Sequence, residues 1–268
     1  MTTRLIFGLT LMLARCAASH GADQPKPLIH AHAHNDYEHT RPLFDALDHG
    51  FCSVEADIYL VNGQLLVAHD RKDLKPERTL QRLYLDPLKK RAIENGGRIY
   101  RNGPTIVLLV DFKTNGEDTW PVLREVLSHY ADILTSFEGG KVTTRAVTVI
   151  LTGGRPEKLV AAEAHRFASL DGKFVDLEAR HPVALMPWIS EQWTKFFQWK
   201  GVDPIPLDER KKLDDYVAQV HQQGKQLRFW GAPDIEPVWR ELRRANVDWI
   251  NSDQLAGLQS FFADDHGQ

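Results

Sequence analysis

The sequence predicts a single α/β domain folded as a closed (β/α)8 TIM barrel. Strand-like segments alternate with helix-like segments about eight times, which is typical of a parallel sheet with outer helices. Residues 105–110 and 146–151 are continuous apolar runs, which indicates strands covered on both faces. The length of 268 residues also suits such a barrel. An open doubly wound sheet is the alternative, but its Gly-rich dinucleotide turn after the first strand is missing.

Each predicted element follows from a local pattern of apolar spacing and turn residues. The predicted strands cover residues 28–34, 51–60, 105–110, 146–151, 167–171, 183–188, 226–230 and 247–251. The predicted helices cover residues 41–49, 80–95, 120–130, 156–164, 208–223, 236–245 and 255–263. The intervening residues 189–206 carry many aromatic side chains without a clear period, so we expect an elaborated loop there.

The first 22 residues are predicted to be a signal peptide, with the barrel domain over residues 23–268. A basic start at Arg4 precedes an apolar run that is too short to span a bilayer. We therefore expect a secreted or periplasmic protein. A lipoprotein anchor at Cys16 is the alternative, although Arg15 stands where that motif has a small residue. Cleavage would leave Cys52 alone, so we expect no internal disulfide.

Two carboxylates and a histidine lie close together in the chain between residues 55 and 70. Glu55 and Asp57 are two residues apart, which places both on one face of a strand. The Asn62-Gly63 pair predicts a type I′ hairpin, which would bring His69 back toward the two carboxylates. Hard oxygen ligands beside an imidazole are typical of a magnesium or calcium hydrolase.

Further polar residues follow other predicted strands, where barrel enzymes carry their active sites. His32 and His34 end the first strand, and Asp111 and Lys113 end the third. Trp230 ends the seventh strand, while Asn251 and Asp253 follow the eighth. Their shared position predicts one site at the carboxyl ends of the strands. The net charge of −3, without a basic block, argues against a nucleic-acid binder.

The order of these motifs resembles the phosphatidylinositol-phospholipase-C-like phosphodiesterases. That superfamily includes glycerophosphodiester phosphodiesterases and spider-type sphingomyelinases D. The resemblance rests on His34, then Glu55-x-Asp57, then His69-Asp70, then Asp111-x-Lys113, and it covers nearly all of the chain after residue 22. The string His-x-His-Asn-Asp-Tyr is most similar to secreted bacterial members and to fungal mitochondrial-inheritance relatives.

This resemblance implies a role for each matching residue. His34 and His69 would be the acid/base pair, and Glu55, Asp57 and Asp111 would hold one divalent cation, Mg²⁺ or Ca²⁺. The phosphate would contact Lys113, Asn35 and Trp230. Their positions in the sequence offer three more candidates: His32 as a hydrogen-bond partner or as the catalytic residue in place of His34, Asp36 as a group that orients an imidazole, and Asp70 either in that role or as a cap of the turn at Arg71. The implied substrate is a small-molecule or lipid phosphodiester, with peripheral membrane contact and oligomeric state left open.

Two departures from the family and two other functions stay open. Asn35 stands where the glycerophosphodiesterases have arginine, and Asp111 stands where they tend to have glutamate. The alternating His30, His32 and His34 also resemble the opening motif of zinc-dependent amidohydrolase and phosphoesterase barrels. A non-catalytic ligand-binding barrel is the remaining alternative.

Overall fold

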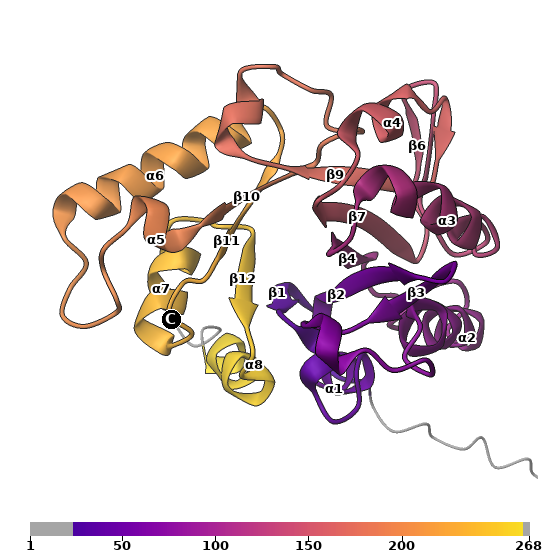
Figure 1. The fold of residues 1–268 in the computed structure, drawn as a ribbon. Helices are drawn as coiled ribbons and strands as arrows, with labels where there is room; N and C mark the ends of the chain where they lie inside the picture. Colours follow the sequence, from indigo (N-terminus) through magenta and orange to yellow (C-terminus); the bar gives the residue numbers. More distant parts are fainter. Residues whose placement is uncertain (1–23, 265–268) are drawn as a thin grey trace, which may run out of the picture.

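Eight parallel strands form a closed ring, which confirms the predicted TIM barrel (Figure 1). The computed structural model describes residues 24–264. The ring closes because β1 pairs with β2 on one side and with β12 on the other. In ring order its strands are β1 (Leu28–Ala33), β2 (Phe51–Val61), β4 (Ile106–Phe112), β7 (Val147–Gly153), β9 (Ala168–Gly172), β10 (Trp188–Gln192), β11 (Gln226–Trp230) and β12 (Trp249–Ser252).

Helices lie outside the ring of strands and cover it (Figure 1). They are α1 (Phe44–Asp48), α2 (Asp86–Glu94), α3 (Gly116–Ser128), α4 (Glu157–Ala162), α5 (Trp193–Phe196), α6 (Leu207–His221), α7 (Glu236–Arg244) and α8 (Leu255–Asp264). A π-helical turn (Gln81–Leu85) leads into α2, and short 3-10 turns lie at Asp36–Glu38, Arg71–Asp73 and Phe174–Leu177. Apolar side chains of helices and strands share one continuous core, as expected for a single domain.

The strand register places the functional residues at one level of the barrel. Asp57 on β2 pairs with Asp111 on β4, and Asp111 pairs with Thr152 on β7. Because alternate residues of a strand point the same way, Glu55 and Asp57 share the inner face. The carboxyl ends of the first strands therefore carry a group of acidic side chains.

The predicted hairpin after β2 is present. Strand β3 (Gln64–Val67) pairs antiparallel with the end of β2. Both central residues have positive φ, 49° at Asn62 and 77° at Gly63, as a type I′ turn requires. The hairpin returns the chain to the barrel mouth just before His69.

The prediction for residues 183–206 is wrong in its details. The strand is β10, which begins at Trp188, the last residue of the segment in which it was predicted, and α5 follows at once. Pro187 lacks an N–H for strand pairing, and the buried Ser190 and Glu191 hid the strand from an apolar pattern. A small sheet of β5 (Ser136–Glu138), β6 (Lys141–Thr143) and β8 (His165–Arg166) was also not predicted, because its strands are too short to show a period.

Within residues 24–264, no helix has both the length and the apolar character needed to cross a membrane. The signal peptide expected over residues 1–22, and Cys16 within it, lie outside the described residues. Cys52, the cysteine that the structure does describe, is buried as a free thiol on β2.

Candidate active site

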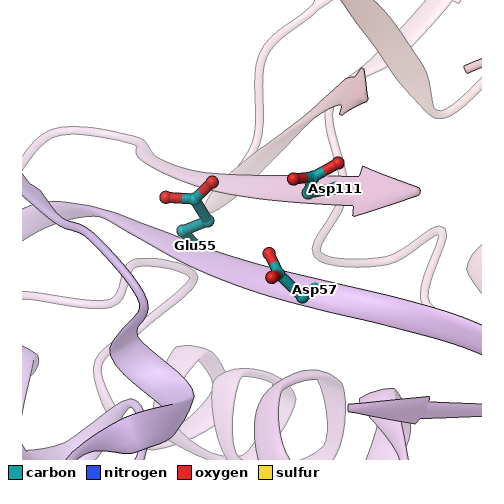
Figure 2. Close-up of side chains that lie close together, drawn as sticks. All are labelled: Glu55, Asp57 and Asp111. Atoms are coloured by element: carbon teal, nitrogen blue, oxygen red, sulfur yellow. The ribbon is translucent and has the colours of Figure 1, made fainter. Parts of the chain in front are cut away.

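Three carboxylates converge at the mouth of the barrel, as Figure 2 shows. Glu55 and Asp57 extend from β2 toward Asp111 on the neighbouring β4. Each offers an oxygen atom, and these atoms lie within 4.8 Å of one another. The pairing of Asp57 with Asp111 accounts for this convergence, since paired residues on adjacent strands lie side by side.

Glu55 is a buried anion that contacts two side chains, one from β1 and one from β11. Its Oε2 lies 3.3 Å from His32 Nε2 on β1 and 3.6 Å from Arg228 Nη2 on β11. Burial alone would raise the pKa of Glu55, but the charge of Arg228 and the hydrogen bond from His32 hold it well below its usual range. The carboxylate is therefore charged at neutral pH.

His32 is a neutral group that positions Glu55. Its side chain is fully buried, and its Nδ1 lies 2.7 Å from Ser53 Oγ. Burial and the charge of Arg228 lower the pKa of His32 to about 4, so the imidazole carries one proton at neutral pH. That proton is donated to Glu55 when Nδ1 accepts from the Ser53 hydroxyl. His32 does not line the cavity at the mouth.

Lys113 forms an ion pair with each of the other two carboxylates. Its Nζ lies 2.7 Å from Asp111 Oδ2 and 3.0 Å from Asp57 Oδ2. The hydroxyl of Tyr37 donates to the same oxygen of Asp57 at 2.6 Å. Burial and the neighbouring negative charges of Glu55 and Asp111 nevertheless raise the pKa of Asp57 to about 6.

The donor set fits a divalent cation. Oδ1 of Asp57 is buried and has no hydrogen-bond partner within the described chain. A buried carboxylate oxygen without a partner is costly unless a cation or water occupies the adjacent space. Three carboxylates with oxygen atoms this close match the ligands that Mg²⁺ and Ca²⁺ prefer.

Gly153 on β7 leaves the space that Asp111 needs. A Cβ added at position 153 would lie 1.8 Å from Asp111 Oδ1. The φ angle of this glycine is +68°, which side chains disfavour as well. A side chain here would therefore displace one of the candidate ligands.

His34 forms a dyad with an acid that follows the eighth strand. Its Nδ1 lies 3.0 Å from Asp253 Oδ1, which leaves Nε2 as the atom available to a substrate. Burial opposes protonation of His34, but the hydrogen bond to Asp253 and the negative charge of Glu55 outweigh it and raise the pKa of the imidazole. Asp253, rather than Asp36 or Asp70, is thus the carboxylate that contacts His34.

His69 lines the same cavity but is more open to solvent, with 55% of its side chain exposed. Its Nδ1 lies 3.5 Å from Asp70 Oδ1, and the hydroxyl of Tyr59 donates to its backbone carbonyl at 3.0 Å. The carboxylate of Asp70 also lies 3.3 Å from Lys72 and makes no capping hydrogen bond to the turn that follows. The two histidines therefore occupy different environments in one cavity.

Of the remaining predicted residues, Asn35 and Trp230 line the cavity and Asp36 does not. Asn35 adopts a left-handed conformation with φ 46°, and Trp230 ends β11; both border the cavity. Asp36 is fully buried and accepts hydrogen bonds from the Leu43 amide at 2.6 Å and the Tyr84 hydroxyl at 2.8 Å. Asp36 therefore orders the loop after β1 instead of orienting an imidazole.

The cavity has a volume of about 310 Å³ and includes residues that sequence reasoning missed. Arg228, Lys173 and Thr152 all line it. Strand alternation could have indicated Arg228, which lies two residues before Trp230. Lys173 directly follows β9, a strand for which the sequence pattern is weak, so its place at the carboxyl end of a strand could not be predicted.

The alternating histidines at positions 30, 32 and 34 do not converge into a group of metal-ligating side chains among the described residues. His30 contacts the Asp248 carbonyl, His32 contacts Glu55, and His34 contacts Asp253. Among residues 24–264, the metal-ligating side chains that converge are the three carboxylates, and that group contains no histidine.

Solved structures with a similar fold are phosphodiesterases. A glycerophosphodiester phosphodiesterase from Parabacteroides distasonis matches with a TM-score of 0.53 and 14% identity, covering 91% of this chain and 100% of that one. A calcium-dependent phosphoinositol-specific phospholipase C from Pseudomonas sp. matches with a TM-score of 0.55 and 12% identity, covering 85% of this chain and 89% of that one. At these identities the likeness shows the fold.

Sequence relatives are fungal proteins. Altered inheritance of mitochondria protein 6 from Eremothecium gossypii is 29% identical over 87% of this chain and 69% of its own length. The homolog from Arthroderma benhamiae is 29% identical over 87% of this chain and 84% of its own length. The Saccharomyces cerevisiae protein is 27% identical over 84% of this chain and 68% of its own length.

These relatives overturn the expected location. They come from yeasts and other fungi, and their name refers to the inheritance of mitochondria, not to bacterial secretion. The prediction of a secreted or periplasmic protein is therefore wrong.

The family itself follows from a direct match. The AIM6-like phosphodiesterase domain matches residues 24–171, which is more than half of the 268 residues. The matched segment contains both cavity histidines, the three carboxylates and Lys113. The chain therefore belongs to the family of AIM6-like phosphodiesterase domains.

Proposed function

We propose that this protein cleaves phosphodiesters with the help of one divalent cation and two histidines. The observation that supports this most is the convergence of Glu55, Asp57 and Asp111 in a cavity that His34 and His69 also line. The family and the fold of the solved relatives agree with phosphodiester hydrolysis. The relative described as calcium-dependent supports a hard cation such as Ca²⁺ or Mg²⁺.

In this proposal the three carboxylates hold the cation, which neutralises the negative charge of the phosphate when bound. The ammonium of Lys113, 2.7 Å from Asp111, adds a second positive charge at the same place. Charge that is fixed in advance stabilises the extra negative charge of the transition state without reorganisation. The amide of Asn35 and the ring of Trp230 border the space where the substituents of the phosphate would lie.

The two histidines divide the proton transfers. His34 accepts the proton of the attacking hydroxyl at Nε2, because Asp253 stabilises the imidazolium that results. His69, which is exposed to solvent, donates a proton to the leaving oxygen. After the reaction His69 regains a proton from water and His34 releases its proton to water. The attacking oxygen forms a bond to phosphorus while the bond to the leaving oxygen breaks.

Two nucleophiles satisfy this scheme. A hydroxyl of the substrate would give a cyclic phosphate and a free alcohol, whereas water would give a phosphomonoester and the alcohol. Phosphorus NMR of the products separates the two, because a cyclic phosphodiester and a phosphomonoester resonate at different shifts.

The test is a panel of glycerophosphodiesters and lysophospholipids assayed with Mg²⁺ and with Ca²⁺. We expect hydrolysis that EDTA abolishes, and a loss of at least about 100-fold in His34→Ala and His69→Ala, since a general acid or base contributes 10²–10⁴-fold. His165→Ala, on the exposed strand β8, is the matched control. Full activity in both active-site variants would contradict the scheme, and failure of the wild type on the whole panel would favour a non-catalytic binding barrel.

A further inference from the structure

Lys173 has a different environment from the other cations of the cavity. The ammonium of Lys113 contacts Asp57 and Asp111, and the guanidinium of Arg228 lies 3.6 Å from Glu55. Lys173 Nζ instead donates to the backbone carbonyl of Ser190 at 2.8 Å. Among residues 24–264, no carboxylate lies within 4.0 Å of this ammonium, so its positive charge has no paired anion.

Three carboxylates close to Lys173 in the chain or on neighbouring strands contact other groups. Asp176 accepts a hydrogen bond from the Lys173 backbone amide at 2.7 Å and lies 3.7 Å from Arg155. Glu191 accepts from the Phe174 amide at 2.8 Å. Oδ2 of Asp171, two residues earlier on β9, accepts from the hydroxyl of Thr152 at 2.9 Å, while its buried Oδ1 has no hydrogen-bond partner within the described residues.

These contacts also fix the position of Lys173. The backbone on either side is bonded to Asp176 and Glu191, and the end of the side chain is bonded to Ser190. An ammonium has three protons, and the Ser190 carbonyl accepts one of them. The others remain available in the cavity that Lys173 lines. A cation held this way binds an anion without first losing the rotamer freedom of a surface lysine.

The ring order places Lys173 away from the proposed site of cleavage. His34 follows the first strand of the ring, Glu55 and Asp57 lie on the second, and Asp111 ends the third. Lys173 follows β9, the fifth strand, which lies opposite β1 in a ring of eight. In the proposal that follows, the group bound by Lys173 is a substituent of the scissile phosphate.

We propose that Lys173 binds a second anionic group of the substrate and so makes the enzyme selective for phosphodiesters that carry an additional carboxylate or phosphate. This inference rests on the proposed function for the position of the scissile phosphate.

Two matched substrate pairs test the proposal. Glycerophosphoserine differs from glycerophosphoethanolamine by one carboxylate, and glycerophosphoinositol 4-phosphate differs from glycerophosphoinositol by one phosphate. For the wild type we expect kcat/KM to be about tenfold higher for the more anionic member of at least one pair, since a hydrogen bond to a charged group contributes a factor of this order. A preference within the first pair would indicate that the site binds a carboxylate, and a preference within the second pair would indicate that it binds a phosphate.

The variants locate the preference at one residue. Lys173→Gln retains an N–H donor for the Ser190 carbonyl, so it should fold, and it should lose the preference, with a larger fall in kcat/KM for the more anionic member than for the less anionic one. Lys173→Arg should keep the preference. Lys200→Gln, at an exposed lysine of the loop after α5, is the matched control and should behave as the wild type.

Binding measurements keep this inference separate from the proposed function. Calorimetry with the same four compounds, at fixed free Mg²⁺, reports the preference even if none is hydrolysed. Hydrolysis without any preference in the wild type would overturn the role of Lys173 and leave the phosphodiesterase proposal intact. A binding preference that Lys173→Gln removes, without hydrolysis, would support the anion site and reject the proposed activity. A preference that persists in Lys173→Gln would overturn the inference.

Discussion

Replacing Asp253 with asparagine should slow the reaction and shift its pH dependence. The carboxylate lies 3.0 Å from His34 Nδ1 and supports the protonated imidazole. A hydrogen bond to a charged group contributes about 1.5–3 kcal/mol, and each 1.36 kcal/mol is a factor of ten in rate. Because 60% of the Asp253 side chain is exposed, solvent screening favours the lower end of that range. We therefore expect kcat to fall by about tenfold in Asp253→Asn.

The pH profile distinguishes this role from a structural one. The contact with Asp253 raises the pKa of His34, so its removal lowers that pKa. A general base is active when unprotonated, and the acidic limb of the kcat profile should therefore move to lower pH. Asp208→Asn, at an exposed position in the first turn of α6, is the matched control and should leave the profile unchanged. A lower kcat with an unshifted profile, or no change at all, would refute the reasoning.

Three further outcomes follow from Asp36, Cys52 and Gly153. Burial raises the pKa of Asp36 from 3.8 to about 7, so the contribution of this carboxyl group to stability is complete below the unfolded pKa and is lost as the pH rises through 7. At 1.36 kcal/mol per pKa unit, the wild type should lose roughly 4 kcal/mol of unfolding free energy between pH 4 and 8 relative to Asp36→Asn. The same pH dependence of the unfolding free energy in both proteins, measured by urea denaturation, would contradict this. Burial raises the pKa of the Cys52 thiol to about 12, so iodoacetamide at pH 8 should label Cys52 in urea and not in the native protein, as peptide mass mapping would show. Gly153→Ala should weaken Mg²⁺ or Ca²⁺ binding by about tenfold or more in calorimetry. Gly139→Ala, at a positive φ with open space around it, is the control and should not weaken binding. Equal affinities of the wild type and Gly153→Ala for the cation would show that Asp111 is not a ligand.

The barrel could be predicted because its strands carry their signal locally. Residues 106–110 of β4 and 147–151 of β7 are mainly apolar, and the Asn62-Gly63 turn specifies its hairpin by conformation alone. Strand β10 could not be located the same way, because Ser190 and Glu191 occupy buried positions that an apolar pattern does not reveal. Tertiary contacts, such as the hydrogen bond that Glu191 accepts from the loop after β9, compensate for these polar groups.

The candidate site was predictable where its residues share a strand and unpredictable where they meet across the ring. Glu55 and Asp57 lie on one strand, and their neighbour Asp111 ends the next parallel strand. The partnership of His34 with Asp253 joins residues 219 positions apart, and it exists because the ring closes between β1 and β12. Sequence spacing offered Asp36 as a nearer partner, but Leu43 and Tyr84 engage its carboxylate instead.

Ring closure also explains how the site keeps a buried negative charge. An isolated buried carboxylate would take up a proton, because desolvation penalises its charged form. Glu55 stays ionised because Arg228 reaches it from β11 and neutral His32 donates to it from β1. Both partners contact Oε2 of Glu55, so its other oxygen is left for the space shared with Asp57 and Asp111. The closed barrel thus does more than bring ligands together, since it sets the charge state that a cation site requires before any cation binds.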